Sequence, residues 1–134
     1  MSPRPTESEL AILAVLWRRG PSTVRDVYDE LGAATGYTTV LKLMQIMADK
    51  GLVKRDERAR SHVYRASAPQ ERMQSKLVGE LLRRAFGGSI RKLMVAALSA
   101  ERASPEELDE IRKLIDEADK SHRNKRSDPK GGRS

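Results

Sequence analysis

The 134-residue chain contains no cysteine. Disulfides, thiolate metal sites and redox-sensing thiols are therefore excluded. The sequence also lacks the apolar run of about 18 residues that a membrane-spanning helix requires. Its first five residues, MSPRP, contain no apolar stretch of the kind found in a secretory signal peptide. We expect a cytoplasmic protein with no membrane insertion.

Histidine is scarce as well. His62 and His122 lie far apart in the sequence, whereas a metal site needs several convergent ligands. Serines and carboxylates are frequent, but no histidine accompanies them in a nucleophile–base pattern, and the chain has no glycine-rich phosphate loop. We expect no catalytic residues, no metal and no cofactor, and the sequence does not indicate an enzyme.

Aromatic residues make up only 4% of the chain, so the core has to be built mainly from aliphatic side chains and methionine. Trp17 and Tyr28 fall on apolar helical stripes and are expected in the core. Tyr64 alternates with basic neighbours, and packing is a better interpretation for it than stacking on a base.

Positive charge is concentrated towards the two ends of the sequence, which has a net charge of +7. Residues 1–66 carry 11 basic and 8 acidic side chains, residues 67–117 carry 9 of each, and residues 118–134 carry 6 and 2. This distribution fits a head that binds a polyanion, a neutral packing segment and a loose basic tail. A solvated surface with a basic bias fits equally well, and charge alone does not separate DNA from RNA or a membrane.

Three segments in the first half share one apolar spacing, i, i+3, i+4, i+7, which predicts one buried face on each of three helices. Two capping boxes, Thr6 with Glu9 and Thr23 with Asp26, mark the starts of the first two helices. The expected breaks are Gly20-Pro21, the segment 32–36 and Gly51. The apolar stripes are Leu10, Leu13, Ala14 and Trp17; Val24, Val27, Tyr28 and Leu31; and Val40, Leu43, Met44 and Met47.

The period then changes to two. Residues 52–55 and 62–65 alternate apolar with polar or basic side chains, as half-buried strands do, and a polar turn, 56–61, separates them. Three short helices followed by a hairpin predict a mainly α fold with a small β-wing, a winged helix-turn-helix.

The second half is predicted to be helical. Ala68-Pro69 marks a boundary, and helices are expected over about 70–86, from Ile90 to Leu98, and from Ser104-Pro105 to about Lys120. From Ser121 onward the polar composition predicts disorder. The expected domains are a DNA-binding head over 1–68, a helical dimerisation domain over 69–120 and a basic tail over 121–134.

Several motifs, in order and at their spacing, are similar to the penicillinase-repressor family (BlaI/MecI/CopY type) of winged-helix transcriptional repressors. The resemblance covers about residues 5–117. The motifs are TESEL (6–10), VLW (15–17), GP (20–21), TVRDVY (23–28), YTTVL (37–41), KGLV (50–53), HVY (62–64), FGGS (86–89) and SPEEL (104–108).

The resemblance implies a homodimeric repressor of resistance or stress operons that binds a double-stranded DNA operator. In the best-known members, a membrane sensor-protease pathway relieves repression by leading to cleavage of the C-terminal region at an Asn-Phe bond. Here Ala96-Ala97 aligns with that bond, and the only asparagine is Asn124. The cysteine cluster of the copper-responsive members is absent. The resemblance therefore supports the role of the DNA-binding half more closely than it indicates which signal relieves repression.

The third helix is the expected recognition helix, because winged helices usually read the major groove with it. Hydroxyl, amide and ammonium groups on its outer face can contact bases or phosphates, and a leucine can touch a thymine methyl. The alternative for Thr38 is that it merely caps the helix. The predicted contacts are Thr38, Thr39, Leu41, Lys42 and Gln45.

The hairpin is the expected phosphate clamp. Residues 50–65 carry six basic and two acidic side chains, and guanidinium groups suit phosphate oxygens. The alternative is that these cations protect a strand edge. Arg25, at the start of the second helix, is a further phosphate candidate, and Tyr37 either reaches a phosphate or covers the break before its helix. The hairpin candidates are Lys54, Arg55, Arg58, Arg60 and Arg65.

The apolar faces of the C-terminal helices are the expected dimer interface, because about 50 residues in three helices make a poor independent core. Packing onto the winged helix of the same chain is the alternative. The interface candidates are Leu77, Leu81, Phe86, Leu93, Met94, Leu98, Leu108, Ile111 and Ile115.

Two other functions are compatible with the fold. A winged helix can serve as a protein-interaction module without sequence-specific DNA binding, although a protein partner has no need of a basic hairpin. RNA binding through the basic tail would require residues 121–134.

Overall fold

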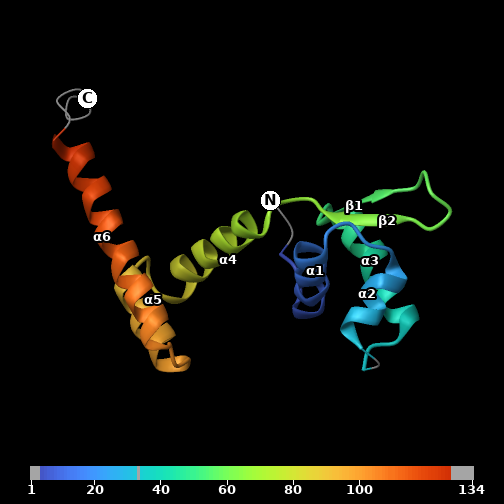
Figure 1. Ribbon diagram of the computed structural model, residues 1–134, viewed down its shortest axis with the longest axis horizontal. Helices are drawn as coiled ribbons and strands as arrows, with labels where there is room; N and C mark the ends of the chain where they lie inside the picture. Colours follow the sequence, from blue (N-terminus) through green and yellow to red (C-terminus); the bar gives the residue numbers. More distant parts are fainter. Residues whose placement is uncertain (1–3, 33, 128–134) are drawn as a thin grey trace. The chain divides into compact units, whose positions relative to one another are not determined.

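The structure is a computed structural model that describes residues 4–32 and 34–127, with side chains up to residue 125 (Figure 1). The chain divides into two compact units, residues 1–81 and 82–134. Each unit is considered by itself. Helices dominate and one small antiparallel sheet accompanies them, so the predicted mainly α fold with a β-wing is confirmed.

The first unit begins with three helices, α1 (Glu7–Arg19), α2 (Val24–Leu31) and α3 (Tyr37–Lys50). Both predicted capping boxes are present: the Thr6 and Thr23 hydroxyls each accept from the backbone N–H three residues on, and the acidic side chain there accepts from the cap N–H. α3 ends at Gly51, whose φ of 82° is left-handed and therefore suits glycine.

The wing is the hairpin of β1 (Val53–Asp56) and β2 (Val63–Ala66), paired antiparallel with Lys54 opposite Arg65. Both strands start one residue later than the alternation predicted. Ser22, between α1 and α2, exchanges two backbone hydrogen bonds with Tyr64 of β2, at 2.9 and 2.8 Å. This isolated bridge holds the wing against the helices (Figure 1).

The core of the first unit lies where α1, α2, α3 and the wing meet. The predicted stripe of α1 is partly wrong, because Ala14 is exposed and the buried face instead includes Ile12, Val15 and Leu16. The stripe of α3 is nearly right, with Leu43 only half-buried. The buried apolar residues are Ile12, Leu13, Val15, Leu16, Val24, Val27, Val40, Met44, Met47, Leu52, Val53 and Tyr64.

The three aromatic predictions have different outcomes. Tyr64 is 1% exposed, so the prediction that it packs in the core is confirmed. Trp17 and Tyr28 lie against the core but are only half-buried. The Trp17 indole N–H donates to the Ala68 carbonyl at 2.9 Å, which ties α1 to the segment after the wing.

That segment leads into α4 (Gln70–Ala85), of which residues 70–81 belong to the first unit. Met73 packs against the core, and the Arg4 guanidinium pairs with the Glu80 carboxylate at 3.1 Å. The start of α4 thus packs against the helices and wing of its own chain. For this part of α4, that is the predicted alternative in which the C-terminal helices pack onto the winged helix of the same chain.

The second unit contains α5 (Ile90–Ala100) and α6 (Pro105–Ser127). The Ser104 hydroxyl accepts from the Glu107 N–H at 3.0 Å, as expected for an N-cap. α6 ends seven residues beyond its predicted end at Lys120, and an i, i+4 ion pair between Arg123 and Asp119, at 3.2 Å, supports the helix there. Residues 128–134 of the predicted tail lie outside the described residues.

None of the described helices is both long and apolar enough to cross a membrane.

Candidate nucleic-acid interface

A hollow of about 260 Å³ lies where the start of α2, the outer face of α3 and the wing meet, and we call it the recognition hollow. Three separate segments of the sequence therefore bring their candidate residues to one place. The predicted contacts that line it are Arg25, Tyr37, Leu41, Gln45, Arg55 and Arg60.

The outer face of α3 presents Thr38, Thr39, Lys42 and Gln45 to solvent, as predicted. Leu41 differs, because it is half-buried and packs against the core while also lining the recognition hollow. Its apolar side chain has a structural role that the helical spacing did not indicate.

Thr38 does not cap α3. The N-cap is Gly36, and no side chain supplies a capping hydrogen bond there. The first turn of α3 therefore starts with backbone N–H groups that no side chain caps, beside the exposed hydroxyls of Thr38 and Thr39. N–H groups in this arrangement favour an anion.

Arg25 is held by two aromatic rings. Its guanidinium carbon lies 5.9 Å from the centre of the Tyr28 ring and 5.7 Å from that of Tyr37. The two rings meet edge to face, 5.7 Å apart at 74°. Cation–π attraction holds the Arg25 guanidinium beside the recognition hollow. No carboxylate in the described part of the chain pairs with it.

The contacts of Tyr37 bear on its two predicted roles, reaching a phosphate or covering the break before α3. Its ring is 42% exposed and packs on α2 through Tyr28 and Arg25. Tyr28 was expected only in the core, and its contact with Arg25 was missed. The sequence signal was the i, i+3 spacing of Arg25 and Tyr28 on one face of α2.

The wing partly neutralises itself. Arg55 pairs with Glu57 at 2.9 Å and Arg58 pairs with Asp56 at 2.7 Å. Hydrogen bonds from the side chain and backbone of Arg58 lower the pKa of Asp56 from 3.8 to about 2. Hydrogen bonding to Tyr64 and then to Glu57 raises the pKa of Arg55 above its usual value. Asp56 is therefore ionised at neutral pH.

The remaining wing cations, Lys54, Arg60 and Arg65, have no carboxylate partner within 4.0 Å among the residues described. The strand register puts Lys54 opposite Arg65, and these two border a second hollow with Arg58, away from Arg60 in the recognition hollow. The predicted clamp residues thus line two hollows, and Arg55 borders both of them.

The described residues hold no group of three or more His, Asp or Glu side chains that could bind a metal ion. His62 lines the recognition hollow beside Arg60 and Ser61, a placement that its strand position alone did not predict.

The residues predicted to form the dimer interface are exposed or half-buried. None of the described residues of the second unit is buried. Leu81, Leu98 and Ile115 are among the most exposed of the predicted set. Met94, Leu98 and Ile111 line a further hollow between α5 and α6. Four large exposed apolar side chains were missing from the prediction: Val78, Ile90, Val95 and Leu114.

Comparison with known proteins shows the family to which this sequence belongs. The family model described as penicillinase repressor matches residues 5–117. The chain belongs to the penicillinase repressor family. It is therefore a member of a family of transcriptional repressors, which is not a family of enzymes.

Individual relatives of the penicillinase repressor family agree with the match. The transcriptional regulator BlaI of Mycobacterium tuberculosis, from two strains, is 30% identical over 120 residues, which cover 87% of this chain and 86% of the relative. The penicillinase repressor of Bacillus licheniformis is 20% identical over 128 residues, which cover 94% and 97%.

Proposed function

We propose that the chain is a sequence-specific transcriptional repressor that binds a pseudo-palindromic DNA operator as a homodimer. The observation that supports this most directly is the recognition hollow, where the exposed face of α3 meets Arg25 and Arg60. A recognition helix flanked by two guanidinium groups suits a major groove flanked by phosphates.

The α3 face contacts the bases. Lys42 can donate to guanine, Gln45 can bond adenine in a bidentate way, and Thr39 can bond either a base edge or a phosphate. Thr38, in the first turn, lies nearest the uncapped N–H groups and contacts a phosphate or base. Leu41 packs against the core beside these residues, and only its exposed part can contact a thymine methyl.

The phosphates on either side are bound by two groups of cations. Arg25, with Tyr37 beside it, lies on the α2 side. The wing supplies the other group, in which Arg60 is unpaired, and Arg55 and Arg58 have to exchange a carboxylate for a phosphate. The wing group also includes Lys54.

The exposed apolar side chains of α4, α5 and α6 support the proposed homodimer. A second copy would cover surface that this chain leaves in water, and two-fold symmetry gives two half-sites about one helical turn apart, or a multiple of that. The candidate interface residues listed above, together with the four that were missed, form this surface.

The regulated genes are proposed to be resistance or stress genes, by analogy with the relative named penicillinase repressor. Relief of repression by a sensor-protease pathway is part of the same analogy. Ala96 and Ala97, where other members have the cleaved bond, are both exposed in α5.

Selection of genomic fragments by the full chain, followed by footprinting, tests the proposal. We expect protection of two symmetrical half-sites, and we expect Lys42→Ala and Gln45→Ala to change the preferred bases. Asp49→Ala, an exposed change in the same helix, is the matched control. A single unsymmetrical footprint, or unchanged base preference in both variants, would contradict the proposal and favour a protein-interaction module.

A further inference from the structure

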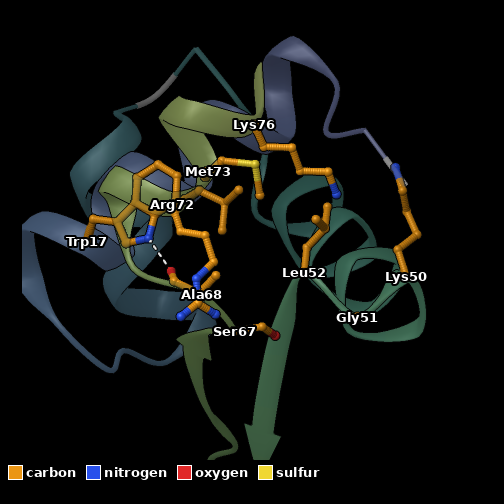
Figure 2. Close-up of a pocket in the computed structure, with 10 residues that line it drawn as sticks. Trp17, Lys50, Gly51, Leu52, Ser67, Ala68, Arg72, Met73 and Lys76 are labelled. Atoms are coloured by element: carbon orange, nitrogen blue, oxygen red, sulfur yellow. Dashed lines mark hydrogen bonds between the residues drawn. The ribbon is translucent and has the colours of Figure 1, made fainter. Parts of the chain in front are cut away.

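Another hollow, of about 250 Å³, lies in the first unit where the wing leads into α4, and we call it the junction hollow (Figure 2). All residues that line it lie within residues 1–81, so it belongs to one compact unit. None of the predicted DNA contacts lines it.

The wall of the junction hollow is mostly apolar. Trp17 of α1, Leu52 before β1 and Met73 of α4 face one another across it (Figure 2), and Leu13 also lines it. The indole N–H of Trp17 donates to Ala68, which fixes the ring as one side of the wall. Such a wall suits a compact apolar group.

The rim is positively charged. Arg72 and Lys76 stand one turn apart on α4, and neither pairs with a carboxylate in the described part of the chain. In Figure 2, Arg72 extends past Trp17 towards Ala68, and Lys76 reaches over towards Leu52. Lys50 also borders the hollow, but its charge is already paired with Glu9 at 2.7 Å.

The lining also contains a polar group without a partner. The hydroxyl oxygen of Ser67 is buried and makes no hydrogen bond within the structure. A buried hydroxyl that lacks a partner costs free energy, so a ligand atom that bonds it would recover part of that cost.

We propose that the junction hollow binds a small organic carboxylate with a compact apolar body. The apolar body packs between Trp17, Leu52 and Met73. The carboxylate accepts from Arg72 and Lys76, whose two charges make the rim selective for an anion. Because one wall comes from α4 and the other from α1 and the start of the wing, the bound ligand bridges them.

Trp17 supplies a direct readout, since it is the only tryptophan of the chain and lies in the wall. The full chain is titrated with phenylacetate, benzoate and octanoate, and the tryptophan emission is recorded. The neutral amides of the same acids are the matched probes. We expect saturation by at least one acid with a Kd of about 1 mM or tighter, and at least about tenfold weaker binding of its amide.

The double variant Arg72→Gln/Lys76→Gln is expected to weaken carboxylate binding at least about tenfold. Lys120→Gln/Lys125→Gln removes the same charge from exposed positions of α6 and is expected to leave binding unchanged. Thermal unfolding of each variant shows whether it is folded. Binding that the amides share, or that the double variant keeps, would overturn the proposal, as would no saturation by any of the three acids.

Methionine methyl resonances give a second measurement that needs no variant. The Met73 signal should shift with the same midpoint as the fluorescence, whereas Met94 in α5 should not. A shift of Met94 without Met73 would place binding elsewhere. None of these outcomes depends on DNA binding, so the site and the proposed repressor function are tested separately.

Discussion

Glu9 is a carboxylate buried in the core, 2% exposed, at the first turn of α1. Burial alone would raise its pKa. Hydrogen bonds from Lys50 and from the Thr6 backbone outweigh that and hold the pKa below its ordinary value of 4.5. The Lys50 contact joins the end of α3 to the start of α1, so this ion pair links two helices that also share the core.

Glu9→Gln is expected to lower the free energy of unfolding by about 1–3 kcal/mol at neutral pH, because Lys50 loses its charged partner. Since the folded-state pKa is lowered, the wild-type advantage is present above pH 4.5 and is lost as the pH falls through the folded value. Urea unfolding at several pH values measures this. Glu7→Gln, an exposed change two residues earlier in the same helix, is the control, and an equal loss in both variants would contradict the prediction.

Arg25 is the cation that we propose binds a phosphate beside α2. Arg25→Gln is expected to weaken DNA binding and to lower the slope of log affinity against log salt by about 1, because one phosphate contact is lost. Arg25→Lys keeps the charge but loses the planar contact with Tyr28 and Tyr37, so its DNA affinity should lie between those of the wild type and Arg25→Gln. Arg18→Gln, which removes a cation paired with Glu30, is the control. Equal slopes for Arg25→Gln and the wild type would remove Arg25 from the interface.

Among the elements, the wing contains ion pairs that would limit the positive charge available to the proposed DNA operator. Asp56→Asn should release Arg58 and raise non-specific DNA affinity about tenfold at 0.1 M salt, as expected for one added contact. With its pKa near 2, Asp56 stays ionised in mild acid, so its ion pair should not change DNA affinity between pH 4 and pH 7. Asp29→Asn, an exposed change in α2, controls for net charge. A similar gain in both variants would show that net charge, and not Arg58, is responsible.

The sequence predicted the elements better than the contacts between them. Capping residues such as Thr6 and Thr23 act on their own backbone, so they mark helix starts without any tertiary information. Strand ends were one residue early, because alternation sets which face a residue occupies and leaves the first paired residue open. The end of α6 was placed too early, because polar composition alone does not separate an exposed helix from a coil.

At the site, the exposed residues of α3 followed from helical spacing, but side-chain pairing did not. The contact between Arg25 and Tyr37 joins two helices across a turn, and the sequence does not give that geometry. The pairing of Arg58 with Asp56 competes with the phosphate role that charge counting assigned to it. The junction hollow was missed because Trp17 and Met73 are far apart in sequence and each was assigned to a different domain.

For the whole molecule, the contrast between the two units is in burial. The first unit has a closed core, whereas the described residues of the second unit include no buried side chain, and Ile90 there is 66% exposed. Exposed apolar area costs about 25 cal/mol for each Å² left in water. The second unit is therefore expected to owe much of its stability to a second copy, which couples folding to chain concentration.

Leu98→Glu tests that coupling, because it puts a carboxylate on an exposed apolar face of α5. Placing a charge in an apolar interface costs several kcal/mol, so the variant should sediment as a monomer at concentrations where the wild type is a dimer. Its melting temperature should no longer rise with concentration, while the wild type keeps that dependence. Ser99→Glu adds the same charge at a neighbouring exposed polar position and should remain dimeric. Because the proposed operator has two half-sites, Leu98→Glu should also bind DNA more weakly although the recognition hollow is intact. A dimeric Leu98→Glu would exclude this face of α5 from the interface.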